Sequence, residues 1–149
     1  MTERREPSTL ESAGVMFGLA LVSAGLVALS LWTASGVKQI GPTSFETEFA
    51  QPGWGCSALL LVIPIFLAAW RHTRFMALMA AAALIPQFIG AGLVIDRTVA
   101  AGWGDGMTGF AWILPLGFTP FFFGAALIGA EVGKAYRRPA VTRFPPPPA

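Results

Sequence analysis

Few residues of this chain could carry out chemistry, and their types and spacing argue against several kinds of site. The single cysteine, Cys56, cannot form an internal disulfide, a redox pair or a cysteine zinc cluster, and the single histidine, His72, cannot supply both ligands of a bis-histidine haem. Glu46 and Glu48 lie close together, but no histidine or serine nucleophile accompanies them to complete acid–base machinery. The carboxylates outside the apolar runs also match no calcium loop. We therefore expect no catalytic residues, no metal site and no cofactor, and a protein that is not an enzyme.

Polar groups inside the apolar runs are the remaining candidates for a site. Pro86 and Gln87 lie in one run, and Thr119 and Pro120 in another. A proline inside a helix frees the carbonyl four residues earlier, and in hydrocarbon such a carbonyl costs several kcal/mol, roughly, unless another group bonds it. These residues either form a polar site near the membrane midplane, as in transporters with broken helices, or bond freed carbonyls or each other across a packed interface. We favour the second interpretation, because no ionisable residue lies inside a predicted crossing and coupled carriers usually need one.

The elements that position these residues follow from composition. The chain has 149 residues, of which 54% are hydrophobic and 12% charged, about half the charged fraction of a soluble domain. Four apolar runs, at residues 13–33, 54–70, 75–95 and 110–130, are each long enough to approach the ~20 residues that cross a bilayer. The sequence predicts an all-α integral membrane protein, a bundle of four transmembrane helices. It would comprise a segment at 1–12, a membrane domain at 13–133 and a basic, proline-rich tail at 134–149.

The basic residues predict the orientation. Eight of the ten fall on the side of the two termini, and only Lys38 and Arg97 fall on the other. Short cytoplasmic loops are enriched in Lys and Arg, so both termini are predicted to be cytoplasmic. The excess of arginine over lysine and the abundance of alanine, glycine and proline suggest a bacterial chain, and hence the cytoplasmic (inner) membrane. The net charge of +2 is too small to suggest a nucleic-acid partner.

Glycines at helical spacing mark candidate packing faces. Gly14 and Gly18 begin the first crossing, Gly25 follows on much the same face, and Gly129 and Gly133 end the fourth. Such small-residue spacings let helix backbones approach closely in membranes. We predict that the first and fourth helices pack together at this depth; the alternative is that either face docks a helix of another protein.

The loop between the first two crossings contains a candidate contact surface. Thr43 to Glu46 has the spacing of a capping box, which predicts a short interfacial helix with Phe45 and Phe49 toward lipid or a partner and Glu46 and Glu48 toward water. An irregular, solvated loop is the alternative.

Cations on the side of the termini are expected to meet anionic lipid headgroups, each contributing about 1 kcal/mol. Between the second and third crossings, His72 is expected to be a solvated loop residue. The candidate headgroup contacts are Arg71, Arg74, Lys134, Arg137 and Arg138.

These features together predict a non-catalytic accessory or structural subunit of a larger membrane complex, such as a respiratory, transport or envelope assembly. Its expected partners are other integral membrane subunits and membrane lipids, with a homo-oligomer as a further option. The alternative function is a small homo-oligomeric channel or facilitator with a polar site around Gln87 and Thr119.

Overall fold

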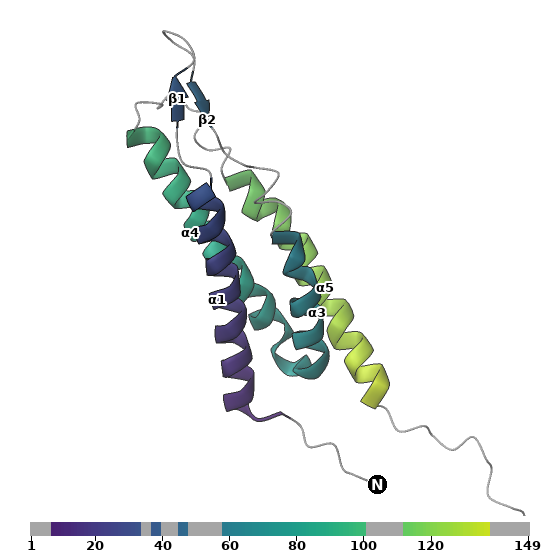
Figure 1. Cartoon of the computed structure of the whole chain (residues 1–149). Coiled ribbons are helices and arrows are strands. Elements are labelled where there is room, and N and C mark those ends of the chain that lie inside the picture. The colour runs from purple at the N-terminus through teal and green to yellow at the C-terminus, as the bar shows by residue number, and fades with distance from the viewer. Residues whose placement is uncertain (1–6, 34–36, 40–44, 48–57, 101–111, 138–149) are drawn as a thin grey trace, which may run out of the picture.

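The computed structural model describes residues 7–33, 37–39, 45–47, 58–100 and 112–137, which are predominantly α-helical, as predicted. The helices run along a common long axis (Figure 1). The elements are α1 (Thr9–Thr33), the strands β1 (Val37–Gln39) and β2 (Phe45–Thr47), α3 (Val62–Arg71), the 3-10 helix η1 (Thr73–Phe75), α4 (Met76–Ala100) and α5 (Ile113–Arg137).

Three helical segments are long and apolar enough to cross a membrane: Thr9–Leu31, Thr73–Asp96 and Ile113–Arg137. At about 1.5 Å per residue each extends beyond the ~30 Å hydrocarbon core, which indicates a membrane protein. The remaining apolar helical segment, Ala58–Arg71, is shorter and extends over only about 20 Å by the same rise per residue. The second predicted crossing thus corresponds to a helix shorter than a full span, and residues 54–57 lie outside the described residues.

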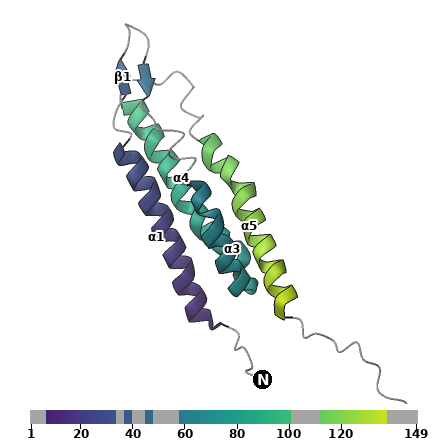
Figure 2. The same cartoon turned by 45° about the vertical axis from the view of Figure 1, so that its right-hand side comes forward.

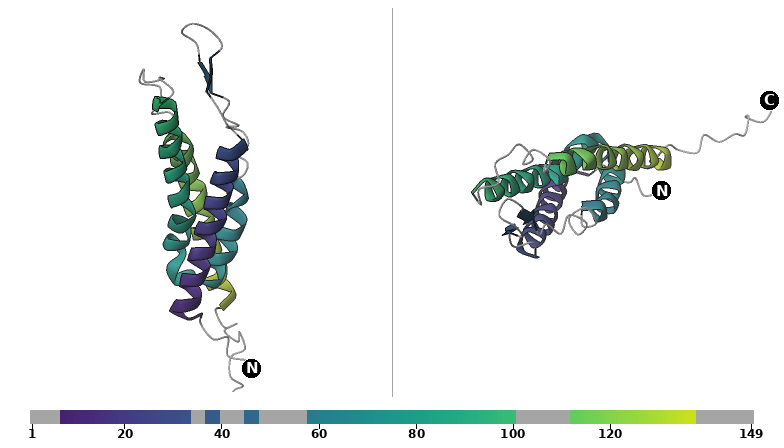
Figure 3. Two further views of the ribbon diagram at one scale, coloured as in Figure 1. Left: turned by 60° about the vertical axis from the view of Figure 1, so that its left-hand side comes forward. Right: turned by 90° about the horizontal axis from the view of Figure 1, so that it is seen from above.

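The helices pair in a definite order. α1 packs on α4, α3 packs on α5, and α4 also packs on α5, which makes α4 the central helix (Figure 2). The start of α1, the turn between α3 and η1, and the end of α5 all lie at one end of the bundle, which we call the His72 end (Figure 1). The β1–β2 hairpin lies beyond the opposite end (Figure 3).

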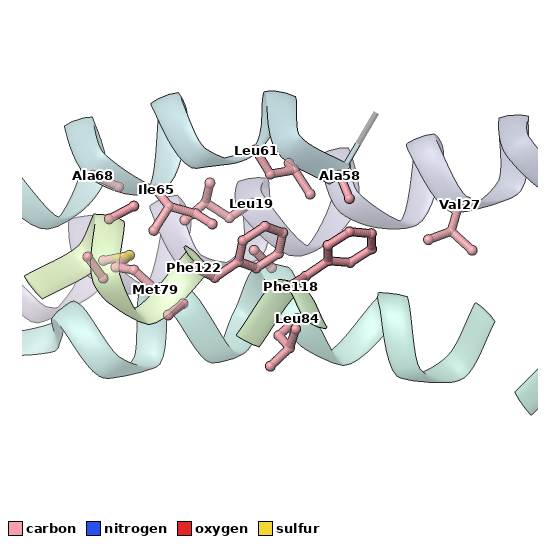
Figure 4. Close-up of a cluster of buried hydrophobic side chains, with 14 of the residues drawn as sticks. Leu19, Val27, Ala58, Leu61, Ile65, Ala68, Met79, Leu84, Phe118 and Phe122 are labelled. Carbon is pink, nitrogen blue, oxygen red and sulfur yellow. The ribbon is translucent and has the colours of Figure 1, made fainter. Parts of the chain in front are cut away.

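A buried cluster of apolar side chains joins the four helices (Figure 4). Phe118 and Phe122 of α5 stack with ring centroids 6.1 Å apart, at the centre of this cluster. Ala80 and Ala83 of α4 are fully buried, because small side chains let neighbouring helices come close to that part of α4.

The short interfacial helix predicted near Phe45 is wrong for Phe45–Thr47, which form β2. This strand pairs antiparallel with β1, with Val37 opposite Thr47 and Lys38 opposite Glu46. β-branched and aromatic residues favour strands, and an antiparallel partner satisfies backbone groups that a single helical turn would leave unpaired. Glu48 and Phe49 lie outside the described residues.

A capping box fixes the start of α1 at Thr9, four residues before the predicted crossing begins. The Glu11 N–H donates to Ser8 Oγ over 3.2 Å, and the Ser8 N–H donates to Glu11 Oε2 over 3.0 Å. The two residues satisfy each other's backbone donors, as the S-x-x-E spacing allows. The helix therefore begins in a polar segment, which hydropathy alone would not assign to the helix.

The prolines divide into two groups. Pro86 and Pro120 lie inside α4 and α5, as predicted. Pro115 is the third residue of α5, in the first turn, where a backbone N–H would have no intrahelical acceptor and its absence breaks no hydrogen bond. A turn at Leu61 separates α3 from the helical residues 58–60, because Pro64 has no N–H for the carbonyl of residue 60.

Candidate functional site

A hydrogen-bonded pair of buried polar side chains joins α1 to α4 at mid-depth. Gln87 Nε2 donates to Ser23 Oγ over 2.9 Å, and Ser23 Oγ donates to the Ala83 carbonyl over 2.6 Å. Gln87 and Ser23 are both fully buried. Polar groups in a low-dielectric interior are costly unless bonded, so this pair fixes which faces of α1 and α4 meet.

Thr119 does not join this pair. Its Oγ1 donates to the Pro115 carbonyl of its own helix over 3.0 Å, a common bond for threonine in a helix. Pro86 is half-buried beside Gln87, while Pro120 is exposed. The structure therefore gives Gln87 and Thr119 different partners. Sequence reasoning overlooked Ser23, although a serine inside an apolar run is a usual hydrogen-bonding group between membrane helices.

The glycines of α5 lie directly against the backbone of α3. A Cβ at Gly129 would overlap the carbonyl of Phe66, and a Cβ at Gly133 would overlap the carbonyl of Trp70. Both pairs are spaced four residues apart, so the contact repeats once per helical turn. The predicted packing of the first helix on the fourth is wrong, because α3 occupies this face of α5 and α1 packs on α4 instead.

The glycines of α1 have no such neighbour. Apart from the adjoining residues and backbone of α1 itself, no heavy atom of the described chain lies within 4 Å of a Cβ built at Gly14, Gly18 or Gly25. At 100° per residue these three positions fall on the side of α1 opposite its buried residues. Those buried residues are Ser12, Leu19, Ser23, Val27 and Leu31.

His72 is buried, so the prediction of a solvated loop residue is wrong. Its Nδ1 lies 2.8 Å from Ser12 Oγ, which is also 3.1 Å from the Ser8 carbonyl. Removal from water lowers the pKa of His72, and the nearby charge of Arg71 lowers it further, with Glu11 acting in the opposite direction. The pair Ser12–His72 thus ties the start of α1 to the turn between α3 and η1 through a neutral imidazole.

Arg137, the last residue of α5, caps the end of α3. Its Nη2 donates to the carbonyls of Trp70, over 2.9 Å, and Arg71. These are among the last carbonyls of a helix, which have no intrahelical partner, and a cation there also complements the helix dipole. Lys134 instead pairs with Glu131 over 2.7 Å, with both side chains exposed.

A shallow hollow, open to the surroundings and with enclosed space for about one water molecule, lies at the His72 end. Arg71 and Arg74, two of the predicted headgroup contacts, are exposed on its lining. Arg138 lies outside the described residues. The lining residues are Pro7, Ser12, Arg71, His72, Thr73, Arg74, Phe75 and Arg137.

Within the described part of the chain, no three histidine, cysteine or acidic side chains gather in a group that could hold a metal ion. Comparison of the chain with protein-family models, with curated proteins and with solved structures gave no match.

Proposed function

We propose that this chain is a non-catalytic accessory subunit of a larger membrane complex, packed against other integral membrane subunits in a bacterial cytoplasmic membrane. In this proposal the chain crosses the membrane four times, and its His72 end faces the cytoplasm. The complex could serve respiration, transport or envelope building.

The observation that carries this proposal is the contrast between the two sets of glycines. A Cβ at Gly129 or Gly133 would overlap the backbone of α3, whereas a Cβ at Gly14, Gly18 or Gly25 would meet no described atom within 4 Å beyond the adjoining residues of α1. α1 is also the least buried of the three long helices, with 22% of its apolar window buried against 44% for α4 and 33% for α5. A helix of another subunit would find on α1 the same backbone access that α3 finds on α5.

The polar side chains of the interior support a packing role. Among the described residues the buried ones are Ser12, Ser23, His72 and Gln87, and all four hydrogen-bond to groups of this chain. Two of these contacts, Ser12–His72 and Ser23–Gln87, join separate elements and specify how α1 docks. The alternative of a channel needs Gln87 and Thr119 in one polar site, and no described contact favours that arrangement.

The placement of cations supports the proposed orientation. Arg71, Arg74, Lys134 and Arg137 all lie at the His72 end, whereas β1, which contains Lys38, lies at the other end. This is the distribution expected of cytoplasmic loops. A reporter that works only in the cytoplasm should therefore be active when it is fused after Ala149, and a reporter that works only outside the cytoplasm should be inactive there. The opposite result would contradict the orientation.

Copurification tests the subunit role. The tagged full-length chain, extracted from its native membrane in a mild detergent, should bring down other membrane proteins in fixed stoichiometry, measured by mass spectrometry and size-exclusion chromatography with light scattering. A lone monomer that stays folded would overturn the proposal. A pure homo-oligomer would also overturn it.

A further inference from the structure

Among the described residues, one buried polar contact joins the start of α1 to another element. Ser12 and His72 are both buried, and Ser12 Oγ lies 2.8 Å from Nδ1 of His72. Farther along the helix, Ser23 donates to the Ala83 carbonyl and accepts from Gln87, which holds α1 on α4. The first turns of α1 therefore depend on the state of His72 in a way that the rest of the helix does not.

The charged groups that face His72 come from α1, α3, η1 and α5. Arg71 precedes it in α3, and Arg74 of η1 and Arg137 of α5 line the same hollow. Glu11 of α1 is the carboxylate whose charge acts on the ring. Burial and the charges of Arg71 and Arg137 lower the pKa of His72, and Glu11 alone opposes them. A positive charge on the buried ring would therefore meet more repulsion than attraction.

Protonation would not by itself break the contact with Ser12. With both ring nitrogens protonated, Nδ1 of His72 would donate to Ser12 Oγ, and the serine hydroxyl would donate to the Ser8 carbonyl, 3.1 Å away. The folded arrangement instead lacks hydration for the charge, because the hollow beside the ring encloses space for about one water molecule.

A charged imidazole is costly in such a place, and it gains full hydration only by leaving Ser12. The backbone at His72 is suited to such a movement, because the residue has φ −114° and ψ 56° and belongs to neither α3 nor η1. Movement of the ring at this turn would therefore require no helix to unwind.

We propose that the contact between Ser12 and His72 is an acid-sensitive latch. Protonated His72 turns out to water, and the first turns of α1 separate from the turn between α3 and η1, while Ser23 keeps the rest of α1 on α4. Acid favours this open form because the ring in water takes up a proton at a higher pH than the buried ring. The latch weakens progressively as the pH at this end falls below about 6.5, the ordinary pKa of histidine. This device does not depend on the proposed subunit role.

Hydrogen–deuterium exchange of the full-length protein in detergent micelles, between pH 7.5 and 5.5, tests the latch. After correction for the pH dependence of chemical exchange, the amide protection of residues 11–16 should fall severalfold, by at most about tenfold for each pH unit, the limit for one titrating group. Residues 24–31 should keep their protection. His72 is the single histidine of the chain, so imidazole NMR signals of protein purified with a histidine-free tag report its protonation directly. They should titrate below the ordinary pKa of 6.5.

Three variants separate the latch from other effects of acid. His72→Asn keeps a hydrogen-bonding group but gains no charge, so the protection of residues 11–16 should not change with pH. Ser12→Ala removes the other half of the contact and should give low protection of these residues already at pH 7.5. Ser23→Ala is the matched control, because it removes the other buried serine of α1 and should leave the pH response of residues 11–16 in place.

Several results would overturn the proposal. It fails if His72→Asn responds to acid as the wild type does, because another group would then cause the response. It also fails if residues 24–31 lose protection in step with residues 11–16, because acid would then release α1 as a whole. An imidazole that titrates at or above pH 6.5 would contradict it as well, since protonation would then not favour the open form.

Discussion

Gly129 of α5 lies so close to the main-chain carbonyl of Phe66 in α3 that there is no room for a side chain between the two helices. The same relationship recurs one turn later, where Gly133 meets the carbonyl of Trp70. Because the obstacle is backbone, it cannot move aside as a flexible side chain would. These two contacts set the distance between α3 and α5.

Gly129→Ala should therefore destabilise the protein by about 1 to 3 kcal/mol, the usual cost of overpacking. Gly124→Ala in the same helix is the control, because no described atom lies within 4 Å of a Cβ built there. That change should be neutral or stabilising by up to about 1 kcal/mol, since alanine loses less backbone freedom than glycine. Unfolding of the purified variants in mixed detergent micelles measures both values. Equal stabilities for the two variants would show that α3 does not press on α5.

The bond between Ser23 and Gln87 should appear as an energetic coupling between α1 and α4. A double-mutant cycle with Ser23→Ala and Gln87→Leu is expected to give about 0.6 to 1.7 kcal/mol, the range for hydrogen bonds between membrane helices. Thr119→Val, which removes a hydroxyl bonded within its own helix, should show no coupling to Gln87→Leu. A coupling between Thr119 and Gln87 as large as that of Ser23 would instead indicate a shared polar site and favour a channel.

Arg137→Gln should lower stability by about 1 kcal/mol, because the last carbonyls of α3 lose a charged donor. Lys134→Gln breaks only an exposed pair within α5 and should cost less than about 0.5 kcal/mol. Added salt should reduce the stability loss caused by Arg137→Gln only partly, because the hydrogen bonds from Arg137 to the carbonyls persist when charges are screened. The cap has no energetic role if the two variants unfold at the same denaturant concentration.

The buried His72 predicts a fall in stability on mild acidification. Burial and the charge of Arg71 hold the pKa of His72 below its ordinary value of 6.5. The unfolded chain therefore takes up a proton at a higher pH than the folded chain, so stability is lost as the pH falls below about 6.5 toward the folded pKa. Melting temperatures between pH 7.5 and 5.5 should decline for the wild type and stay flatter for His72→Asn, which keeps a hydrogen-bonding group near Ser12. Parallel declines would mean that another group causes the effect.

Much of the fold follows from hydropathy. The apolar runs at residues 13–33, 75–95 and 110–130 correspond to the long helices α1, α4 and α5, because a continuous apolar stretch of that length has few other ways to bury its backbone groups. The ends of the helices depend on local polar contacts instead. Ser8 and Glu11 extend α1 into a charged segment, and their spacing is readable in the sequence once a helix start is sought there.

The pairing of helices was not predictable from spacing alone. Gly14 with Gly18 and Gly129 with Gly133 have the same spacing. Only the three-dimensional structure shows that α3 lies against the second pair, whereas no other described element lies within 4 Å of a Cβ built at the first pair. The burial of His72 has a similar reason: its partner Ser12 is 60 residues away in the chain, and no local pattern links them. Long-range contacts of this kind depend on which faces meet, which the one-dimensional pattern does not encode.

The open glycine face of α1 provides the most direct test of the central claim that this chain packs against another membrane subunit. Gly18→Leu adds a bulky side chain to that face, where no atom beyond the adjoining residues of α1 lies within 4 Å of a Cβ built at residue 18. Ala24→Leu adds bulk to another, exposed side of the same helix. The measurement is the molar ratio of partner protein to tagged chain after purification from the native membrane, with the monomer's melting temperature as a check on folding. We predict that Gly18→Leu sharply lowers this ratio, that Ala24→Leu retains the wild-type ratio, and that both variants stay folded. An unchanged ratio in Gly18→Leu would contradict the account.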